Sequence, residues 1–423
     1  MKDEAQHLSR ALIGQAGTAL AALLEFSGPA DQALSRFFRA HRSLGRRDRA
    51  FIAEAVFAVL RRKRSLEAAA GSSDPRALLL GALVRVQGYS GRSLEGVLSR
   101  EDREIVARIK QADPEGMPDA VRADLPDWLW QRLEQQLGRD EAMQTARAML
   151  NPAPLDLRVN LARTERDAVL ERLAQDGLQG SPMSYSPAGI RIEGKPAINR
   201  HPLFMEGLIE VQDEGSQILA WLVGPRRGEM IGDFCAGAGG KTLALSMLMR
   251  GTGRVYAMDV SDRRLAALGP RASRAAVTNI HPIVLGGDND ARLKRLAGKL
   301  DRVLVDAPCS GFGTLRRNPD LKWRHRPEAI EELALKQERI LGAAARLVKP
   351  GGRLVYATCS LLDEENDAVA DAFARSHSEF VELSCEELLA GQRIPIATGR
   401  RLKLRPQVHK TDAFFAAAFT RPA

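Results

Sequence analysis

The sequence predicts an α/β protein with a doubly wound, largely parallel sheet in its C-terminal half. From about residue 204 onward, short apolar segments typical of buried strands alternate with helical stretches. This alternation favours a parallel sheet covered by helices. Before about residue 150, apolar residues recur at helical spacing with little clustering of β-branched residues. The 423 residues also exceed one ordinary domain. We therefore expect a helical domain over 1–150, a small β-α-β element over 151–203 and the α/β domain over 204–423.

The N-terminal region predicts a helix that packs on a core rather than a membrane anchor. Its longest uncharged stretch, residues 11–24, is too short to cross a bilayer. Asp3 and Glu4 are unlike the basic start of a signal peptide. Ile13, Leu20, Leu23 and Leu24 instead fall on one apolar helix face.

A basic run with interleaved aromatic residues follows in the helical region. Two acidic residues, Asp48 and Glu54, oppose this run. The run contains Arg36, Arg39, Arg42, Arg46, Arg47, Arg49, Arg61, Arg62, Lys63 and Arg64, with Phe37, Phe38, Phe51 and Phe57 among them. One interpretation is a surface for RNA phosphates. The other places the aromatic residues in the core and the arginines on the wet face of the same helices, and the two are compatible. The net charge of +9 agrees with a nucleic-acid partner.

Further elements follow in order along the chain. The small element predicts a strand at 155–160, a helix at 164–175 and a strand at 189–193. The α/β domain predicts strands at 229–234, 253–258, 282–285, 302–305 and 353–357. Pro327 suits the first turn of a helix over 327–349, which Pro350-Gly351-Gly352 would stop.

The carboxyl ends of these strands are the place to look for a ligand. After the first strand comes DFCAGAGGKT, residues 233–242. A P-loop would need glycine at Cys235, and a dinucleotide fingerprint would need glycine at Thr242. A nucleoside-type ligand such as S-adenosylmethionine is the third interpretation, because it has no phosphates to bind.

Acidic residues after three successive strands favour the third interpretation. These are Asp259, Asp288 and Asp306. A single aspartate at such a place is more often a helix cap. Three together would repel phosphates but suit a cationic sulfonium with ribose hydroxyls and an amino group.

The cysteines point to covalent chemistry. The four residues, Cys235, Cys309, Cys359 and Cys385, form no C-x-x-C pair, which argues against structural zinc and disulfides and fits a reducing cytoplasm. Cys309 and Cys359 each follow a predicted strand end, although a lone cysteine there is commonly a small buried hydrophobe.

Ionising half of such thiols at pH 7 requires the thiolate to be stabilised over the thiol by roughly 2 kcal/mol. A thiolate beside a methyl donor suggests addition to C6 of a pyrimidine, which activates C5 for methylation.

With these residues in place, the chain resembles the RsmB-like (Sun/Fmu) bacterial RNA cytosine-5 methyltransferases over nearly its whole length. The catalytic motifs are residues 233–242, 306–313, 318–323 (NPDLKW), 349–352 (KPGG) and 356–360 (YATCS) with Glu365-Asn366. Residues 212–216 (QDEGS), 157–160 (LRVN) and the basic run also resemble family segments. Departures are Gly237-Ala238, where relatives more often have Ala-Pro, and Ala413, where glycine is common.

The resemblance implies a Rossmann-like S-adenosylmethionine-dependent domain, preceded by a NusB-like helical RNA-binding domain and a small RNA-recognition element. It implies that Cys359 attacks C6, that Cys309 assists product release and that Asp306 contacts the cytosine; the residues alone do not decide which cysteine attacks. It assigns the cofactor to Cys235, Ala236, Gly237, Ala238, Gly239, Gly240, Lys241, Asp259, Arg264, Asp288 and Asp306.

The expected function is methylation of cytosine C5 in small-subunit (16S) ribosomal RNA by a monomeric cytoplasmic enzyme without metal or membrane partners. Transfer RNA is the alternative substrate, and a non-catalytic ribosome assembly factor is the alternative from another class. Intact Cys309, Cys359 and Asp306 argue against the latter. Beyond the basic run, the expected RNA-facing charges are Arg316, Arg317, Lys322, Arg324, Arg326, Arg400, Arg401, Lys403 and Arg405.

Overall fold

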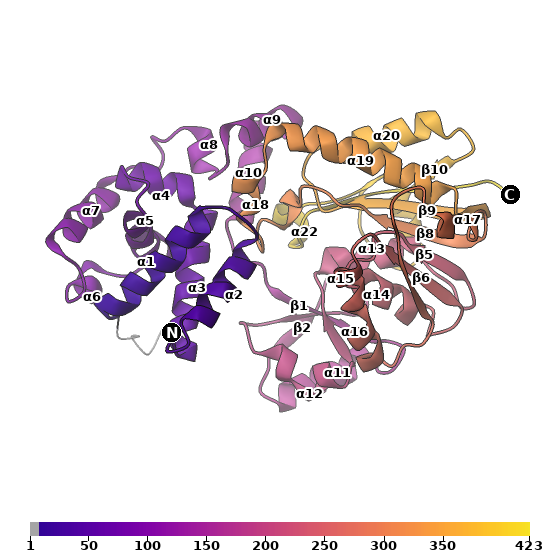
Figure 1. Cartoon of the computed structure of the whole chain (residues 1–423), viewed down its shortest axis with the longest axis horizontal. Helices are drawn as coiled ribbons and strands as arrows, with labels where there is room; N and C mark the ends of the chain where they lie inside the picture. Colours follow the sequence, from indigo (N-terminus) through magenta and orange to yellow (C-terminus); the bar gives the residue numbers. More distant parts are fainter. Residues whose placement is uncertain (1–7) are drawn as a thin grey trace. The chain divides into compact units, whose positions relative to one another are not determined.

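The computed structural model describes residues 8–423, so Asp3 and Glu4 lie outside the described residues. The chain divides into two compact units (Figure 1). The first contains the residues up to 152 together with 314–327, and the second contains 153–313 and 328–423. We call them the helical unit and the α/β unit. The expected division at 150/151 and 203/204 stays a prediction.

The helical unit is built from short amphipathic helices around one apolar core. Residues 11–24 form most of α1 (Arg10–Leu24), which buries Ile13, Leu20 and Leu23 as expected. The other helices are α2 (Ala30–Ala40), α3 (Arg46–Arg61), α4 (Lys63–Ala70), α5 (Pro75–Gly81), a π-helical turn (Ala82–Val86), α6 (Gly91–Leu94), α7 (Arg100–Gln111), α8 (Asp119–Arg122), α9 (Asp127–Leu137) and α10 (Arg139–Met149). Across residues 8–423, no helix has the length and apolarity needed to cross a membrane.

The helical unit also contains the NPDLKW segment, residues 318–323, which lies far along the sequence from the other helices of this unit. Its helix α18 (Leu321–Arg324) lies at the end of α3. Trp323 Nε1 donates to Leu60 O at 2.8 Å, and Lys322 Nζ donates to Arg61 O at 2.8 Å. These side chains therefore satisfy carbonyls that the last turn of a helix leaves without partners. Burial lowers the pKa of Lys322 to about 7.

The α/β unit begins with a small antiparallel sheet in the strand order β2-β3-β1-β4. Its strands are β1 (Leu155–Val159), β2 (Gly180–Pro182), β3 (Gly189–Ile192) and β4 (Ile209–Val211), and α11 (Arg166–Gln175) follows β1. Leu157, Val169 and Ile190 share its apolar core. Because β4 pairs with β1, the sheet continues past residue 203.

The large sheet has the strand order β10-β12-β9-β8-β5-β6-β7, and β11 pairs with β12. The strands are β5 (Met230–Asp233), β6 (Arg254–Asp259), β7 (Ile280–Val284), β8 (Leu300–Asp306), β9 (Val348–Thr358), β10 (Val381–Leu383), β11 (Leu402–Leu404) and β12 (Phe414–Thr420). The pairs that link β7, β6, β5, β8 and β9 are parallel, as the sequence predicted, and β12 is antiparallel to β9.

Helices cover both faces of this sheet (Figure 1). The core on one face includes residues of α19 (Pro327–Ala345) and α20 (Asp367–Ser376). The core on the other includes residues of α13 (Glu214–Val223), α14 (Gly240–Leu248) and α21 (Cys385–Ala390). The remaining helices are α12 (Pro202–Met205), α15 (Asp262–Ala266), α16 (Leu268–Arg274), α17 (Ala291–Lys294) and α22 (Pro406–His409).

The predicted end of the long helix was wrong. The helix begins at Pro327 but ends at Ala345 rather than at residue 349. Val348 already pairs with Leu300 of β8. The buried Leu347 and Val348 belong to the apolar core that β8 and β9 share. Apolar residues after the helix thus join the sheet, and Pro350-Gly351-Gly352 lies within β9, where the register with β8 shifts, instead of stopping a helix.

Candidate active site

A cavity of about 520 Å³ opens at the carboxyl ends of the parallel strands, within the α/β unit. Loops after β5, β6, β7, β8 and β9 contribute to its wall, and α19 closes one side. The lining residues are Phe234, Cys235, Ala236, Gly237, Ala238, Asp259, Val260, Arg264, Leu285, Gly287, Asp288, Asp306, Ala307, Pro308, Cys309, Lys336, Ile340 and Cys359. The structure thus brings the three predicted aspartates and both predicted cysteines to one site.

The glycine-rich loop after β5 is held by the end of the neighbouring strand. The backbone N–H of Gly237 donates to Asp259 Oδ2 at 2.8 Å. Asp259 Oδ1 accepts from Ser261 N at 2.8 Å and from the guanidinium of Arg264 at 3.1 Å. Gly239 has φ +83°, and a Cβ there would lie 2.2 Å from Leu268 Cδ1, so this position requires glycine. Asp259 therefore positions the loop as well as lining the cavity.

A buried carboxylate lies beneath the same loop. Asp233 ends β5, is fully buried and accepts a hydrogen bond from Thr242 Oγ1 at 2.7 Å. Its other oxygen, Oδ1, has no hydrogen-bond partner. Burial raises the pKa of Asp233 to about 7. This side chain supports α14 from inside the fold, outside the cavity wall.

Lys241 and Asp306 form an ion pair beside the cysteines. The Nζ atom of Lys241 lies 2.7 Å from Asp306 Oδ2. Burial alone would lower the pKa of Lys241, but the Asp306 carboxylate outweighs it and the net pKa is raised. Lys241 also interacts electrostatically with Cys359.

The two sulfur atoms of Cys309 and Cys359 lie 3.4 Å apart. The hydrogen bond to Cys359 and burial together raise the pKa of Cys309 well above its ordinary value. The backbone N–H of Gly313 donates to Cys359 O at 2.8 Å, which links the loop that follows Cys309 to Cys359 itself.

Most of the predicted cofactor residues line the cavity, with three exceptions: Gly239, Gly240 and Lys241. Lys241 still reaches the site through Asp306. Val260, Leu285, Gly287, Lys336 and Ile340 line the cavity but were not predicted as site residues. Val260 follows a predicted strand and Leu285 ends one, so their positions carried a signal, whereas nothing in the helical pattern of α19 distinguishes Lys336.

The basic run divides between surface and core. Phe37 and Phe51 are buried, as the core interpretation expected. Phe38 and Phe57 are half-buried and line a shallow hollow of about 560 Å³ on the helical unit. Arg39, Arg42 and Arg49 line the same hollow. The guanidinium of Arg49 lies 5.7 Å from the ring centre of Phe38. Aromatic faces among arginines suit stacked bases and phosphates.

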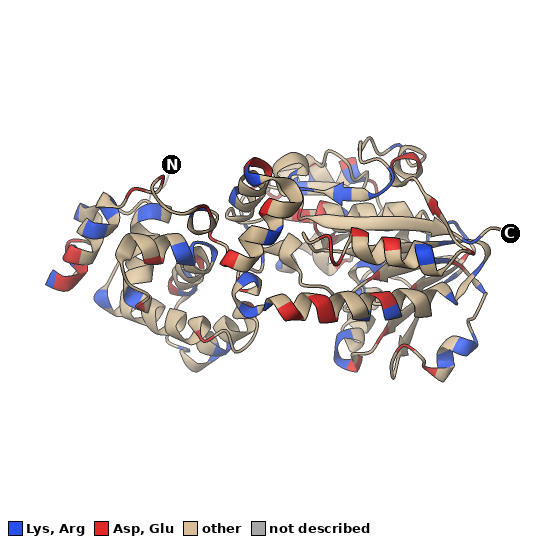
Figure 2. Ribbon diagram, turned by 90° about the horizontal axis from the view of Figure 1, so that it is seen from above, with Lys and Arg blue, Asp and Glu red and all other residues tan. Residues whose placement is uncertain are grey.

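Other basic residues expected to face RNA hold the fold instead. Arg61 donates to Arg316 O at 3.0 Å, and Arg64 pairs with Asp127 at 2.7 Å. Lys322 is buried. Arg401 forms ion pairs with three acidic residues, Asp367, Asp371 and Glu382. Figure 2 accordingly shows basic residues spread over both units and interspersed with acidic ones.

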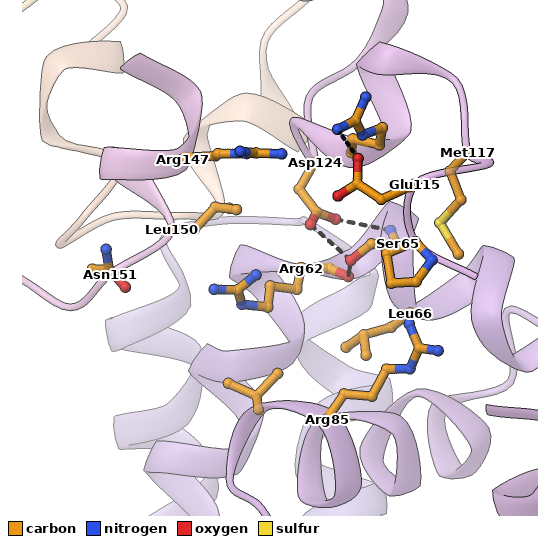
Figure 3. A pocket seen from close by; sticks show the side chains of 13 residues that line it. Arg62, Ser65, Leu66, Arg85, Glu115, Met117, Asp124, Arg147, Leu150 and Asn151 are labelled. Atoms are coloured by element: carbon orange, nitrogen blue, oxygen red, sulfur yellow. Dashed lines mark hydrogen bonds and ion pairs between the residues drawn. The ribbon is translucent and has the colours of Figure 1, made fainter. Parts of the chain in front are cut away.

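A second cavity in the helical unit, of about 600 Å³, is also rich in arginine (Figure 3). Several of its charged groups have structural partners. Asp124 accepts from Ser65 N at 2.9 Å and Ser65 Oγ at 2.8 Å. Arg85 donates to Ile109 O at 2.9 Å. These groups join helix ends to one another and therefore stabilise the helical unit.

Comparison with known proteins identifies the family. The chain is 34% identical over 422 residues to the probable ribosomal RNA small subunit methyltransferase B of Synechocystis sp., covering 92% of this chain and 94% of the relative. The chain belongs to the RsmB family. The family model described as 16S rRNA methyltransferase RsmB/F matches residues 220–420, and a model for the RsmF/B-like ferredoxin-like domain matches residues 125–199.

Solved structures agree with the fold of this RsmB-family protein. The crystal structure of PH0851 superimposes with a TM-score of 0.80 at 26% identity and covers 98% of this chain and 99% of its own. The structure of NSun6 from Pyrococcus horikoshii with SFG has a TM-score of 0.62 at 20% identity, covers 70% of this chain and 98% of its own, and shows the fold alone. The α/β unit therefore has the Rossmann-like fold of S-adenosylmethionine-dependent methyltransferases.

Proposed function

We propose that this RsmB-family protein methylates C5 of cytosine in small-subunit ribosomal RNA, with S-adenosylmethionine as methyl donor and a covalent Cys359–C6 adduct as intermediate. The observation that carries the proposal is the pair of sulfur atoms 3.4 Å apart in the wall of the cavity that Asp306 also lines. The curated relative described as a small-subunit rRNA methyltransferase supports the RNA substrate.

The cavity has the chemistry that the cofactor requires. Its carboxylates, Asp259, Asp288 and Asp306, suit ribose hydroxyls, an amino group and a sulfonium charge. Val260 and Leu285 offer apolar surface for a base. The backbone of residues 235–238 lines the cavity without bulky side chains apart from Cys235. The neighbour solved with SFG supports a ligand in this fold. When bound, S-adenosylmethionine supplies an electrophilic methyl group.

The protein's own groups divide the covalent steps between the two cysteines. The Cys359 thiolate adds to C6, a C–S bond forms, and the C5–C6 electron pair makes C5 nucleophilic. Once C5 has taken the methyl group and S-adenosylhomocysteine is left, the C5 proton passes to water or to Cys309, the C5–C6 double bond re-forms and the Cys359 thiolate is expelled. Cys309, which lies 3.4 Å from the attacking sulfur, is placed to assist this release. The assignment of the attack to Cys359 rests on the family resemblance.

Asp306 contacts the cytosine in this proposal, and the ion pair with Lys241 sets its orientation. Lys241 at the same time interacts electrostatically with Cys359. One ammonium group therefore interacts with both the base-binding carboxylate and the nucleophile. The target base must leave its stack to reach this site, at a cost of a few kcal/mol that is smallest for single-stranded RNA.

The helical unit would act as the NusB-like RNA-binding domain of the protein. Its hollow combines exposed arginines with half-buried phenylalanines. Arginines there neutralise phosphates and release counterions, which gives affinity without base specificity. Base choice then depends on the cavity that holds the cysteines.

The proposed function is tested by incubating the purified protein with a 16S rRNA transcript or 30S particles and methyl-labelled S-adenosylmethionine. Digestion of the RNA to nucleosides is expected to yield label in 5-methylcytidine. Transfer RNA serves as the comparison substrate. Label in another nucleoside, or none in any RNA, would overturn the proposal.

A further inference from the structure

Each of the two cysteines is followed by a serine, and both serines bond to one buried carboxylate. Ser310 follows Cys309 and Ser360 follows Cys359. The backbone N–H of Ser310 donates to Glu365 Oε1 at 2.8 Å, and its hydroxyl donates to Oε2 at 2.5 Å. The hydroxyl of Ser360 donates to the same Oε2. Glu365 is fully buried, so it cannot touch substrate directly.

The second oxygen of this carboxylate extends the network to the helix that covers the sheet. Gln337 of α19 donates through Nε2 to Glu365 Oε1 at 3.0 Å and to Pro308 O at 3.0 Å. Tyr356 donates through its hydroxyl to the backbone carbonyl of Glu365 at 2.5 Å. Pro308 immediately precedes Cys309. The cysteine is therefore held on both sides by groups bonded to Glu365 or to its partner Gln337.

A carboxylate at this position can accept more hydrogen bonds than other side chains of similar size. Its partners here are neutral donors, and four donor groups share its two oxygens: the Ser310 N–H, two serine hydroxyls and the Gln337 amide. A buried carboxylate without them would cost several kcal/mol. An amide side chain has one acceptor oxygen and would face one donor pair with its own NH₂ group. An apolar residue would remove the shared acceptor: the two serine hydroxyls would keep only each other, at 3.1 Å, Gln337 would keep only Pro308 O, and the Ser310 N–H would lose its Glu365 acceptor.

We propose that Glu365 is the positioning residue that fixes the Cys309 loop against the Cys359 loop and so sets the spacing of the two sulfur atoms. The role in catalysis rests on the proposed function, whereas the spacing of the sulfurs does not. Loss of the carboxylate leaves the two loops joined only by weaker links, among them the Gly313–Cys359 and Ser310–Ser360 hydrogen bonds, so the spacing of the two sulfur atoms is less tightly fixed. A displacement near 1 Å is enough to lower a rate by about 100-fold.

The test compares Glu365→Ala, Glu365→Gln and Ser360→Ala with Ser246→Ala. Ser246 is a matched control, because it is a fully buried serine of the same unit whose hydroxyl bonds to Asn279 at 2.6 Å. We expect kcat for RNA methylation to fall by about 100-fold in Glu365→Ala and by smaller factors in the other two site variants. The KM for RNA and the Kd for S-adenosylmethionine stay near the wild-type values. Ser246→Ala loses stability but keeps kcat.

The second readout needs neither RNA nor cofactor. Phenylarsine oxide forms two As–S bonds with a close pair of thiols and releases water, so its affinity reports the sulfur spacing, and Cys309→Ala identifies the signal. We expect Glu365→Ala and Ser360→Ala to bind this probe more weakly than Ser246→Ala does. If Glu365→Ala does not fold, Ser360→Ala gives the same comparison.

Unchanged probe affinity and unchanged kcat in Ser360→Ala and Glu365→Gln, with stability lowered as in Ser246→Ala, would show that Glu365 is merely structural and would overturn the proposal. If wild-type protein methylates no RNA but the probe affinities change as expected, the proposed function fails while the positioning role stands.

Discussion

The Cys309 sulfur lies 3.4 Å from the Cys359 sulfur although the residues are 50 positions apart in the chain. The sheet explains this relationship. Strands β8 and β9 are parallel neighbours in which Asp306 pairs with Ala357, and Ala307 N donates to Ala357 O at 2.9 Å. Each cysteine follows its strand end by a few residues, so both loops leave the sheet at the same place. The single connection between the parallel strands β8 and β9 therefore brings the two thiols together.

Replacing the proposed nucleophile should separate chemistry from cofactor binding. In Cys359→Ala, methyl transfer to RNA should fall below detection, because no thiolate remains to activate C5. The Kd for S-adenosylmethionine should stay within about threefold of wild type, since only the edge of the cavity changes. Radiolabel transfer and calorimetric titration measure the two quantities. Retention of full transfer by this variant would refute the assignment of the attacking cysteine.

The proposed RNA surface can be tested by removing the three arginines that line its hollow. The triple variant Arg39→Ala, Arg42→Ala and Arg49→Ala should bind RNA more weakly and lower the slope of log K against log salt by about 2, if each makes one phosphate contact. The control removes the same charge elsewhere on the helical unit, with Arg92→Ala, Arg100→Ala and Arg103→Ala. Equal losses of affinity in both triple variants would show that net charge, not this hollow, attracts RNA.

Asp233 gives a prediction about stability and pH. Because burial raises the pKa of Asp233 to about 7, the folded protein keeps a proton that the unfolded chain loses near pH 4. The folded state therefore binds more protons in this window, and the stabilisation is present at low pH and lost as pH rises through 7.

Asp233→Asn removes that titration while leaving an acceptor for the Thr242 hydroxyl. The free energy of unfolding of the variant, relative to wild type, should thus increase by roughly 2 to 3 kcal/mol between pH 5 and pH 8. Urea unfolding at the two pH values measures this difference. A difference that does not change with pH would contradict an unusual pKa for Asp233.

The sequence predicted the parallel strands, and with them the place where the cysteines and aspartates meet, because both depend on local patterns. Strand ends followed by acidic residues or cysteines locate the site once the strands are known to be parallel. Glu365 stood in a recognised motif, but its contacts could not be predicted, because Ser310, Ser360 and Gln337 meet it only in three dimensions. The two neighbouring serines offered a weak clue in the repeated Cys-Ser pairs of the sequence.

The sequence did not predict which basic residues are exposed and which are buried. Charge in the sequence does not tell a solvent-exposed arginine from one that caps a helix. Arg39 and Arg42 remain exposed, but Lys322 lies buried at the end of α3 and donates to Arg61 O. The NPDLKW motif, which reads as a basic segment after Cys309, thus contributes Lys322 and Trp323 to the packing of the helical unit.

The most direct test of the covalent mechanism is adduct trapping with Cys309→Ala, followed on a denaturing gel with labelled 16S rRNA and S-adenosylmethionine. We predict a slowly migrating protein–RNA band in Cys309→Ala that is absent from the double variant Cys309→Ala, Cys359→Ala, because attack proceeds while release fails. Normal turnover of Cys309→Ala without any adduct, or an adduct that survives in the double variant, would contradict the account.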